Sequence, residues 1–401
     1  MRDQRTFRPP LPGVPVFLRR TCDGTLRGRP RSLISLATWT GSTLVRMSAA
    51  GRSSHLASPW AIVVAGAVAV ALLLSACSGQ GRPYERPTSA SASGCTVTVT
   101  NPRDAQAALD RAAPGDVVCF SGAGMADADL VVRKSGTEQA PITLRGAGVA
   151  VRSVQVKADH VVVDGFTAEG GVGLQLQGNG LTARGNTVRN TTTDAISCDT
   201  CRDSLLDHNT VVRADGSGIL ISGERITVQR NDVSGSVKKN SGDADGIRFF
   251  GQGHRIADNI VHDISMDGYS DPPHPDCFQT FDNSAPSTSD ITISGNRCTG
   301  VGQQCLIATA VQAHQSHGIH FVGNICSIGA SQAVLLEWFP DVEVRDNQIG
   351  GTKLERGISL MNGSVNGKVV NNRFVRGGYP FFEADDSSKP GLQHQGNTVI
   401  D

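Results

Sequence analysis

The chain is organised by a short alternating pattern of apolar and polar residues that recurs along most of its length. In each copy the alternating run ends in the form x-Asn-x-apolar, as in LTARGNTV and ITVQRNDV. Period-2 alternation is typical of a β-strand with one buried face. Consecutive Asn positions are 22 to 37 residues apart, so each repeat is a unit that must stack on its neighbours to bury its apolar side. The recurring positions are Asn186, Asn209, Asn231, Asn259, Asn296, Asn324, Asn347, Asn372 and Asn397.

A second short strand lies between successive Asn strands. It begins with a small or polar residue followed by an apolar one, as in Gly218-Ile219, Gly246-Ile247 and Cys305-Leu306. No helical periodicity separates the two kinds of strand, and the Leu-x-x-Leu-x-Leu ladder of a leucine-rich repeat is absent. We therefore predict an all-β fold for residues 95–401, a single-stranded parallel β-helix of about ten coils.

The recurring Asn is expected to be structural. Asn tolerates the left-handed turn conformation between strands. In coils stacked about 4.8 Å apart, like side chains can also hydrogen-bond along the axis. The stretch VVVDGFT at 161–167 fits the same frame, with Gly165 in the Asn place.

The start of the repeat region predicts a capping helix. Asn101 to Ala113 (NPRDAQAALDRAA) has an amphipathic pattern and is followed by Pro114-Gly115-Asp116. This succession resembles the opening of many secreted right-handed β-helix proteins of the pectate-lyase-like superfamily. The resemblance implies a right-handed solenoid whose exposed first coil is covered by the helix, which prevents end-to-end association.

The N-terminal 94 residues are expected to direct export. The fifteen apolar residues from Trp60 to Leu74 are too few to span a bilayer. They are followed by Leu74-Ser75-Ala76-Cys77, which resembles the bacterial lipobox. We predict a mis-assigned extension at 1–46, a lipoprotein signal peptide at 47–76 that starts at Met47, and a lipidated Cys77 on a flexible Ser/Gly/Pro-rich tether at 77–94. The folded part is then held at the cell envelope outside the cytoplasm, and the lipid is its only membrane contact.

Charge is unevenly distributed, which narrows the class of partner. Residues 1–59 contain ten Arg and two Asp, and the whole chain is neutral, so the remainder carries a net charge of −8. An acidic domain argues against a nucleic-acid partner. An acidic polysaccharide or another glycan would have to be bound by a local group of cations. We expect the chain to be a monomer.

Eight cysteines in the exported part are disulfide candidates, because an even number outside the cell is typical of disulfide bonding. Equivalent positions in successive coils hold Cys277 with Cys305, and Cys298 with Cys326. The sequence leaves the connectivity open, and these last four could instead be stacked free thiols. The candidates are Cys95, Cys119, Cys198, Cys201, Cys277, Cys298, Cys305 and Cys326.

Candidate chemistry concentrates where the repeat is most disturbed. The coil between Asn259 and Asn296 is about fourteen residues longer than the shortest coils, and the preceding coil has its own insertion at 238–244. Long loops on a rigid scaffold are where function usually lies. If Ile247 and Phe278 face the core, alternation directs the following residues outward. Arg248 and Gln279 then stack in one outward-facing column. Phe250 and Phe281 form a pair of exposed rings in the next outward-facing column, and the same column holds Glu337 in a later coil.

A motif in the long loop adds a specific expectation. The stretch Asp267-Gly268-Tyr269 leading to Asp271-Pro272-Pro273-His274 resembles the Asp-Gly-Tyr…Asp-Pro-His motif of mannuronan C5-epimerases and related uronate-active β-helix enzymes. The Tyr-to-His spacing matches, whereas the Asp is one position closer to the Tyr and Pro275 replaces an acidic residue. The resemblance implies that Tyr269 and His274 act as acid and base on a uronate.

Removal of the proton on the carbon next to a carboxylate also requires that the charge of the carboxylate be neutralised. Arg248 is the candidate for this, helped by Lys238 or Lys239. We expect Asp271 and Asp276 to orient His274. The remaining substrate-binding candidates are Gln279, Phe250, Phe281, Asp245 and Glu337.

Other interpretations of the same residues stay open. Asp245 and Asp276 could merely cap turns, or they could form the carboxylate pair of a glycoside hydrolase. The sequence does not specify a cofactor, although calcium could be held by Asp243, Asp245, Asp267 and Asp271. The function classes are therefore a lyase or epimerase on an acidic polysaccharide, a hydrolase, or a non-catalytic glycan-binding or structural β-helix.

Overall fold

Residues 94–282, 286–312, 315–329 and 331–401 are described by a computed structural model. The predicted extension, signal peptide, Cys77 and nearly all of the tether lie outside these residues. Among the described residues, no helix combines the length and the apolar character that a bilayer crossing demands.

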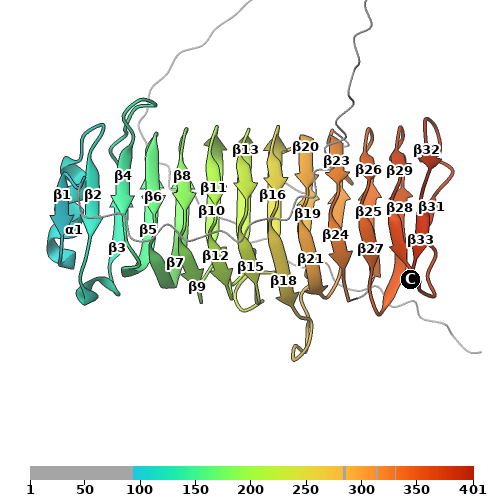
Figure 1. Cartoon of the computed structure of the whole chain (residues 1–401), viewed down its shortest axis with the longest axis horizontal. Coiled ribbons are helices and arrows are strands. Elements are labelled where there is room, and N and C mark those ends of the chain that lie inside the picture. Colours follow the sequence, from blue (N-terminus) through green and yellow to red (C-terminus); the bar gives the residue numbers. More distant parts are fainter. Residues whose placement is uncertain (1–93, 283–285, 313–314, 330) are drawn as a thin grey trace, which may run out of the picture. The chain divides into compact units, whose positions relative to one another are not determined.

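The described residues form a parallel β-solenoid of about 12 turns (Figure 1). Every pairing between named strands is parallel, and strands inside the stack pair with their counterparts in the preceding and following coils. The predicted fold is therefore confirmed. The coil number is higher than the predicted ten because the first coils lack the recurring Asn.

The strands form three faces, each running the length of the stack. Face A contains β3 (Asp129–Val132), β5 (Ala150–Lys157), β7 (Thr167–Gln177), β10 (Ile196–Arg202), β13 (Ile219–Glu224), β16 (Ile247–Gln252), β19 (Phe278–Phe281), β22 (Leu306–Thr309), β25 (Ser331–Glu337), β28 (Leu354–Met361) and β31 (Phe382–Ala384).

Face B contains β1 (Val97–Val99), β2 (Val117–Phe120), β4 (Ile142–Arg145), β6 (Val161–Asp164), β8 (Thr182–Arg184), β11 (Leu205–Asp207), β14 (Thr227–Gln229), β17 (Arg255–Ala257), β20 (Ser289–Ser294), β23 (His317–Val322), β26 (Glu343–Arg345), β29 (Lys368–Val370) and β32 (Gln393–Gln395).

Face C contains β9 (Thr187–Arg189), β12 (Thr210–Val212), β15 (Asp232–Ser234), β18 (Ile260–Ile264), β21 (Arg297–Val301), β24 (Ile325–Ser327), β27 (Gln348–Gly350), β30 (Arg373–Val375) and β33 (Thr398–Ile400). The first parts of β5 and β7 extend this face toward the N-terminus.

The expected capping helix is present at the N-terminal end of the stack. Helix α1 (Pro102–Arg111) begins after Asn101, whose side chain accepts hydrogen bonds from the backbone N–H groups of Arg103 and Asp104. Its buried residues are Ala105, Ala108 and Leu109. A single 3₁₀ turn, η1 (Ala123–Met125), follows β2.

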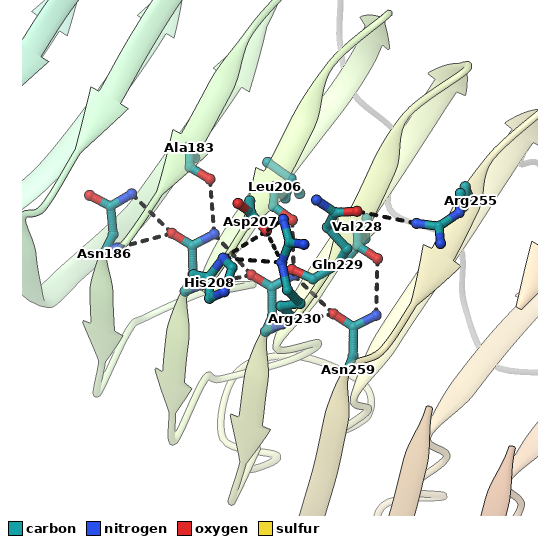
Figure 2. A network of polar contacts seen from close by, with 12 residues as sticks. Ala183, Asn186, Leu206, Asp207, His208, Val228, Gln229, Arg230, Arg255 and Asn259 are labelled. Carbon is teal, nitrogen blue, oxygen red and sulfur yellow. Dashed lines mark hydrogen bonds and ion pairs between the residues drawn. The ribbon is translucent and has the colours of Figure 1, made fainter. Parts of the chain in front are cut away.

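The recurring Asn residues form an uninterrupted ladder, which Figure 2 shows in part. In each step the side-chain oxygen of one Asn accepts hydrogen bonds from the backbone and side-chain N–H groups of the Asn one coil earlier, as between Asn209 and Asn231 at 2.9 Å. The same geometry runs from Asn186 to Asn397. The predicted ladder is confirmed.

Two details of the predicted turn are wrong. The left-handed residue is the one before the ladder Asn, for example His208, Arg230 and Asp258, with φ of 54°, 54° and 57°. In addition, Phe166 and not Gly165 stands in the ladder column, because the backbone N–H of Phe166 donates to Asn186 Oδ1 at 2.9 Å. Gly165, with φ of 75°, takes the left-handed turn position in its coil. A ladder Asn is thus selected for its amide and not for tolerance of positive φ.

The eight cysteines form four disulfides: Cys95–Cys119, Cys198–Cys201, Cys277–Cys298 and Cys305–Cys326. The predicted stacking of Cys298 on Cys326 is confirmed by the strand register. The last two disulfides lie within single coils, and each connects the start of a face A strand with face C through the buried core. The Cys277–Cys298 bond therefore anchors the end of the long loop that follows β18.

Candidate functional site

Two buried carboxylates mark the turns that enter β16 and β19. Asp245 and Asp276 have no solvent exposure. Asp245 Oδ1 accepts the backbone N–H of Asp276 at 3.0 Å, and Asp276 Oδ1 accepts that of Gln304 at 2.8 Å. Each carboxylate therefore uses one oxygen to bind the turn of the next coil, which is the turn-capping role considered above.

The second oxygen of each carboxylate binds side chains that point outward from face A. Asp245 Oδ2 contacts the guanidinium of Arg248. Asp276 Oδ2 lies 3.1 Å from His274 Nδ1 and accepts the amide of Gln279 at 2.9 Å. The same two residues thus belong both to the framework and to a polar cluster on its surface. We call this cluster, formed by Asp243, Asp245, Arg248, His274, Asp276 and Gln279, the 243–279 site.

Arg248 is the cation of this site. The strand register pairs it with Gln279 in the next coil, as the alternating pattern predicts. Its Nη2 also lies 3.6 Å from Asp243 Oδ2, and its Cζ lies 5.4 Å from the centre of the Phe281 ring. The side chain is only 19% exposed, and its buried Nε has no hydrogen-bond partner in the part of the chain that the structure describes. Arg248 is therefore held rigidly, with part of its donor capacity unused.

His274 is the accessible ionisable group of the site, with 48% of its side chain exposed. It lies between the buried residues Pro273 and Pro275, and its backbone N–H donates to Asp243 Oδ1 at 2.6 Å. The hydrogen bond with Asp276 raises the pKa of His274, while partial burial opposes this effect. Because Nδ1 faces Asp276, Nε2 is the ring nitrogen that remains for a ligand.

The two buried carboxylates have perturbed acidities. Burial raises the pKa of Asp245 well above its ordinary value, although the nearby Arg248 lowers it. Burial also raises the pKa of Asp276, against the lowering effect of its hydrogen bond with His274. Perturbed ionisable groups that cluster on one surface are typical of sites that transfer protons.

The long loop holds a second group of candidates beside this site. The Tyr269 hydroxyl accepts the backbone N–H of Lys238 at 3.2 Å, and Lys238 Nζ pairs with Asp271 Oδ2 at 2.7 Å. The expectation that Asp271 orients His274 is therefore wrong, because the flexible ammonium of Lys238 reaches this carboxylate and leaves it 87% exposed. Only Asp276 contacts the His274 ring among the expected partners.

The predicted pair of exposed rings is only partly present. Phe250 and Phe281 are neighbours, with ring centroids 5.0 Å apart at 80°, as the register requires. Phe250 is 7% exposed because Phe281 covers it, so it is not available for sugar stacking. Phe281 is half-buried beneath Arg248.

Glu337 and Lys239 lie away from the 243–279 site. Glu337 is two coils beyond Phe281 in the same column and accepts a hydrogen bond from Asn362 at 3.2 Å. The backbone N–H of Lys239 donates to Asp215 Oδ1 at 2.8 Å, and its side chain is exposed.

The suggested calcium cluster does not form in the described part of the chain. Asp243 and Asp245 are directed at Arg248, and Asp271 at Lys238. No group of three or more His, Cys, Asp or Glu side chains in that part is arranged to hold a metal ion. The side chains of Arg248 and Lys238 already contact carboxylate oxygens that calcium would need.

Sequence reasoning missed what positions the 238–243 turn. Asp215 is almost completely buried, and its carboxylate accepts backbone N–H groups from Lys239, Asn240 and Ser241. Burial would raise the pKa of Asp215, but these hydrogen bonds outweigh it and lower the pKa. The insertion at 238–244 could have suggested such an anchor, but not which residue of the preceding coil provides it.

The comparisons with known proteins agree on the fold. A family of right-handed β-helix regions matches residues 137–261. The A-module of a mannuronan C-5 epimerase from Azotobacter vinelandii is 16% identical, with 76% of this chain and 97% of that chain covered and a TM-score of 0.48. A surface adhesin of Streptococcus pneumoniae is 13% identical, with 71% and 86% covered and a TM-score of 0.41. A pectate lyase is 13% identical, with 76% and 80% covered and a TM-score of 0.39.

The described residues form a right-handed parallel β-helix, in agreement with the family match. The likenesses to solved structures concern the fold alone. They include both enzymes and an adhesin, so they do not select an activity. No curated protein matches the chain.

Proposed function

We propose that the 243–279 site binds a uronate-containing polysaccharide and removes the proton on the carbon next to the sugar carboxylate, as a lyase or an epimerase does. The observation that carries this proposal is the pairing of His274 with the buried Asp276, together with Asp243, which contacts both His274 and Arg248. A base and a cation are the two groups that such a proton removal requires.

Two unpaired buried atoms support a uronate as the ligand. Among the described residues, Arg248 Nε is a donor without an acceptor, and Gln279 Oε1 is an acceptor without a donor. The two residues are neighbours across adjacent strands. Buried polar groups normally have partners, so a ligand that draws these two side chains outward would supply both complements. A uronic acid carries a carboxylate for the arginine and hydroxyl groups for the amide.

The proton transfers follow from the hydrogen bonds of His274. Asp276 Oδ2 accepts a hydrogen bond from the Nδ1–H group of His274, which leaves the unprotonated Nε2 as the base, the arrangement known from catalytic triads. As the proton leaves the sugar, negative charge develops on the sugar carboxylate, and Arg248 stabilises it. The raised pKa of Asp245 favours its neutral form, in which it compensates less of the Arg248 charge.

Tyr269 remains the candidate acid. Its hydroxyl accepts a hydrogen bond from Lys238, so its own proton is left to be donated to the sugar. Delivery of a proton to the opposite face of the same carbon gives an epimer, whereas departure of the glycosidic oxygen gives an unsaturated product. The hydrolase alternative loses support, because Asp245 and Asp276 are fully buried and each uses one oxygen in a turn.

The full chain should be incubated with a panel of uronate polymers, including polymannuronate and polygalacturonate. Ultraviolet absorbance detects the unsaturated product, and solvent deuterium uptake at C5 detects epimerisation. We expect His274→Ala to lower the rate by about 10²–10⁴ while binding persists. His262→Ala is a matched control, because His262 also pairs with Asp residues but on face C. If the wild-type protein binds a uronate polymer but neither cleaves it nor exchanges its C5 proton, the proposed enzyme activity is refuted and the glycan-binding alternative remains.

A further inference from the structure

A hollow of about 330 Å³ lies on face A in earlier coils than the 243–279 site. This volume is at the lower end of the range for small-molecule binding pockets. Strands β5, β7 and β10 supply most of its lining. The polar residues that line it include Gln155, Lys157, Gln175, Gln177, Ser197 and Asp199.

The strand register places this hollow and Arg248 on one line. Gln155 pairs with Gln175, Gln175 with Ser197, Ser197 with Leu220, and Leu220 with Arg248. These side chains therefore belong to a single outward-facing column of face A. From Gln175 to Arg248 there are three coil steps, or roughly 14 Å at the usual strand spacing. A polysaccharide that follows the solenoid axis can contact both places.

The hollow is distinguished by polar side chains that the fold does not use. Among the described residues, no hydrogen-bond or ion-pair partner exists for the side chains of Gln155, Lys157 and Gln177. Charged residues on faces B and C of the same part of the solenoid behave differently and pair across coils. Arg184 binds Asp164 at 2.9 Å, for example, and Arg189 binds Glu169 at 2.8 Å. The unpaired groups gather at a concave surface, where a ligand can reach them.

We propose that this hollow is a second carbohydrate subsite, which takes neutral sugar residues of the polymer whose uronate lies at Arg248. The lining has one cation, Lys157, and one anion, Asp199, so it offers no net charge to a carboxylate. The glutamine amides and the hydroxyl of Ser197 both donate and accept, as sugar hydroxyl groups do. The connection to Arg248 rests on the proposed function, whereas binding of neutral sugar in the hollow does not.

The test uses the full chain and a panel of neutral hexasaccharides made of β-1,4-linked glucose, mannose or xylose, with binding followed by NMR titration. The double variant Gln155→Ala/Lys157→Ala removes two unpaired side chains and should leave the melting temperature unchanged. We expect at least one neutral hexasaccharide to bind the wild type and to lose about tenfold in affinity in this variant, because two hydrogen bonds disappear. The control variant Lys353→Ala/Gln395→Ala removes the same side-chain types from exposed positions outside the hollow.

The outcomes separate this inference from the proposed function. Arg248→Ala should leave neutral binding intact and weaken binding of a mannuronate hexasaccharide. If no neutral hexasaccharide binds, or if the double variant binds as the wild type does, the subsite is refuted even when uronate binding depends on Arg248. If neutral binding depends on Gln155 and Lys157 but Arg248→Ala does not affect uronate binding, the subsite stands and the proposed function falls.

Discussion

Replacing Asn259 by Ala tests whether the Asn ladder holds the coils together. Asn259 is 1% exposed and lies in the middle of the ladder. Its Oδ1 accepts both the backbone and the side-chain N–H of Asn231 at 3.0 Å. Its Nδ2 donates to Val228 O at 3.0 Å and to Asn296 Oδ1 at 2.9 Å. The substitution removes all four hydrogen bonds and leaves donors and acceptors buried on both sides.

The magnitude follows from these contacts. At about 1 kcal/mol for each hydrogen bond, the variant should lose about 4 kcal/mol of unfolding free energy. Asn397 is the matched control, because it ends the ladder. Its side chain makes three hydrogen bonds, two to Asn372 and one to Val369 O, in a partly exposed environment. Water can replace some of these partners, so Asn397→Ala should cost about 1–2 kcal/mol.

Urea unfolding followed by circular dichroism, together with native-state hydrogen exchange, gives the measurement. Stacked repeats can unfold in parts, so the exchange rate of the Asn231 amide provides a local readout. We expect this amide to exchange faster in Asn259→Ala than in Asn397→Ala. Our account of the ladder is wrong if the unfolding free energy of Asn259→Ala lies within about 1 kcal/mol of the wild-type value, or if Asn397→Ala lowers the unfolding free energy more than Asn259→Ala does.

Two further predictions concern ionisation and anchoring. The hydrogen bond with Asp276 raises the pKa of His274 above 6.5, so Asp276→Asn should lower the NMR titration midpoint of His274. The stabilising effect of a raised histidine pKa is present below its unfolded-state pKa and is lost as pH rises through the folded-state pKa. An unchanged midpoint in Asp276→Asn would contradict the contact. For Cys77, the acyl chains are the only predicted anchor, so Cys77→Ala should release the protein from membranes in a fractionation assay. Continued membrane retention would rule out the lipoprotein interpretation.

The alternating pattern alone predicted the framework on which the site is built. Ile247 and Phe278 are fully buried, and Arg248 pairs with Gln279 in the next coil, as the period-2 alternation required. This succeeds because alternation and repeat length are local properties that fix which side chains face inward and which coils are neighbours. The ladder Asn residues were likewise found from their spacing, although the left-handed residue proved to be the preceding one.

Contacts made by the loops were much less predictable. The sequence indicated that His274 and Asp271 share a long loop, but Asp271 binds Lys238 from the preceding coil. The orienting carboxylate is Asp276, next to Cys277, whose disulfide fixes that end of the loop. Such contacts depend on how two insertions from adjacent coils fold over each other, and no periodic signal describes that.

What the sequence by itself determined is therefore the solenoid, its inward and outward columns and the location of the unusual coil. The tertiary structure decided the disulfide partners, the covering of Phe250 by Phe281 and the concave surface around Gln155 and Lys157. The physical reason is the range of the interactions. Strand alternation is set within a few residues, whereas the burial of a particular side chain depends on residues in other coils, about twenty to forty positions away in the chain.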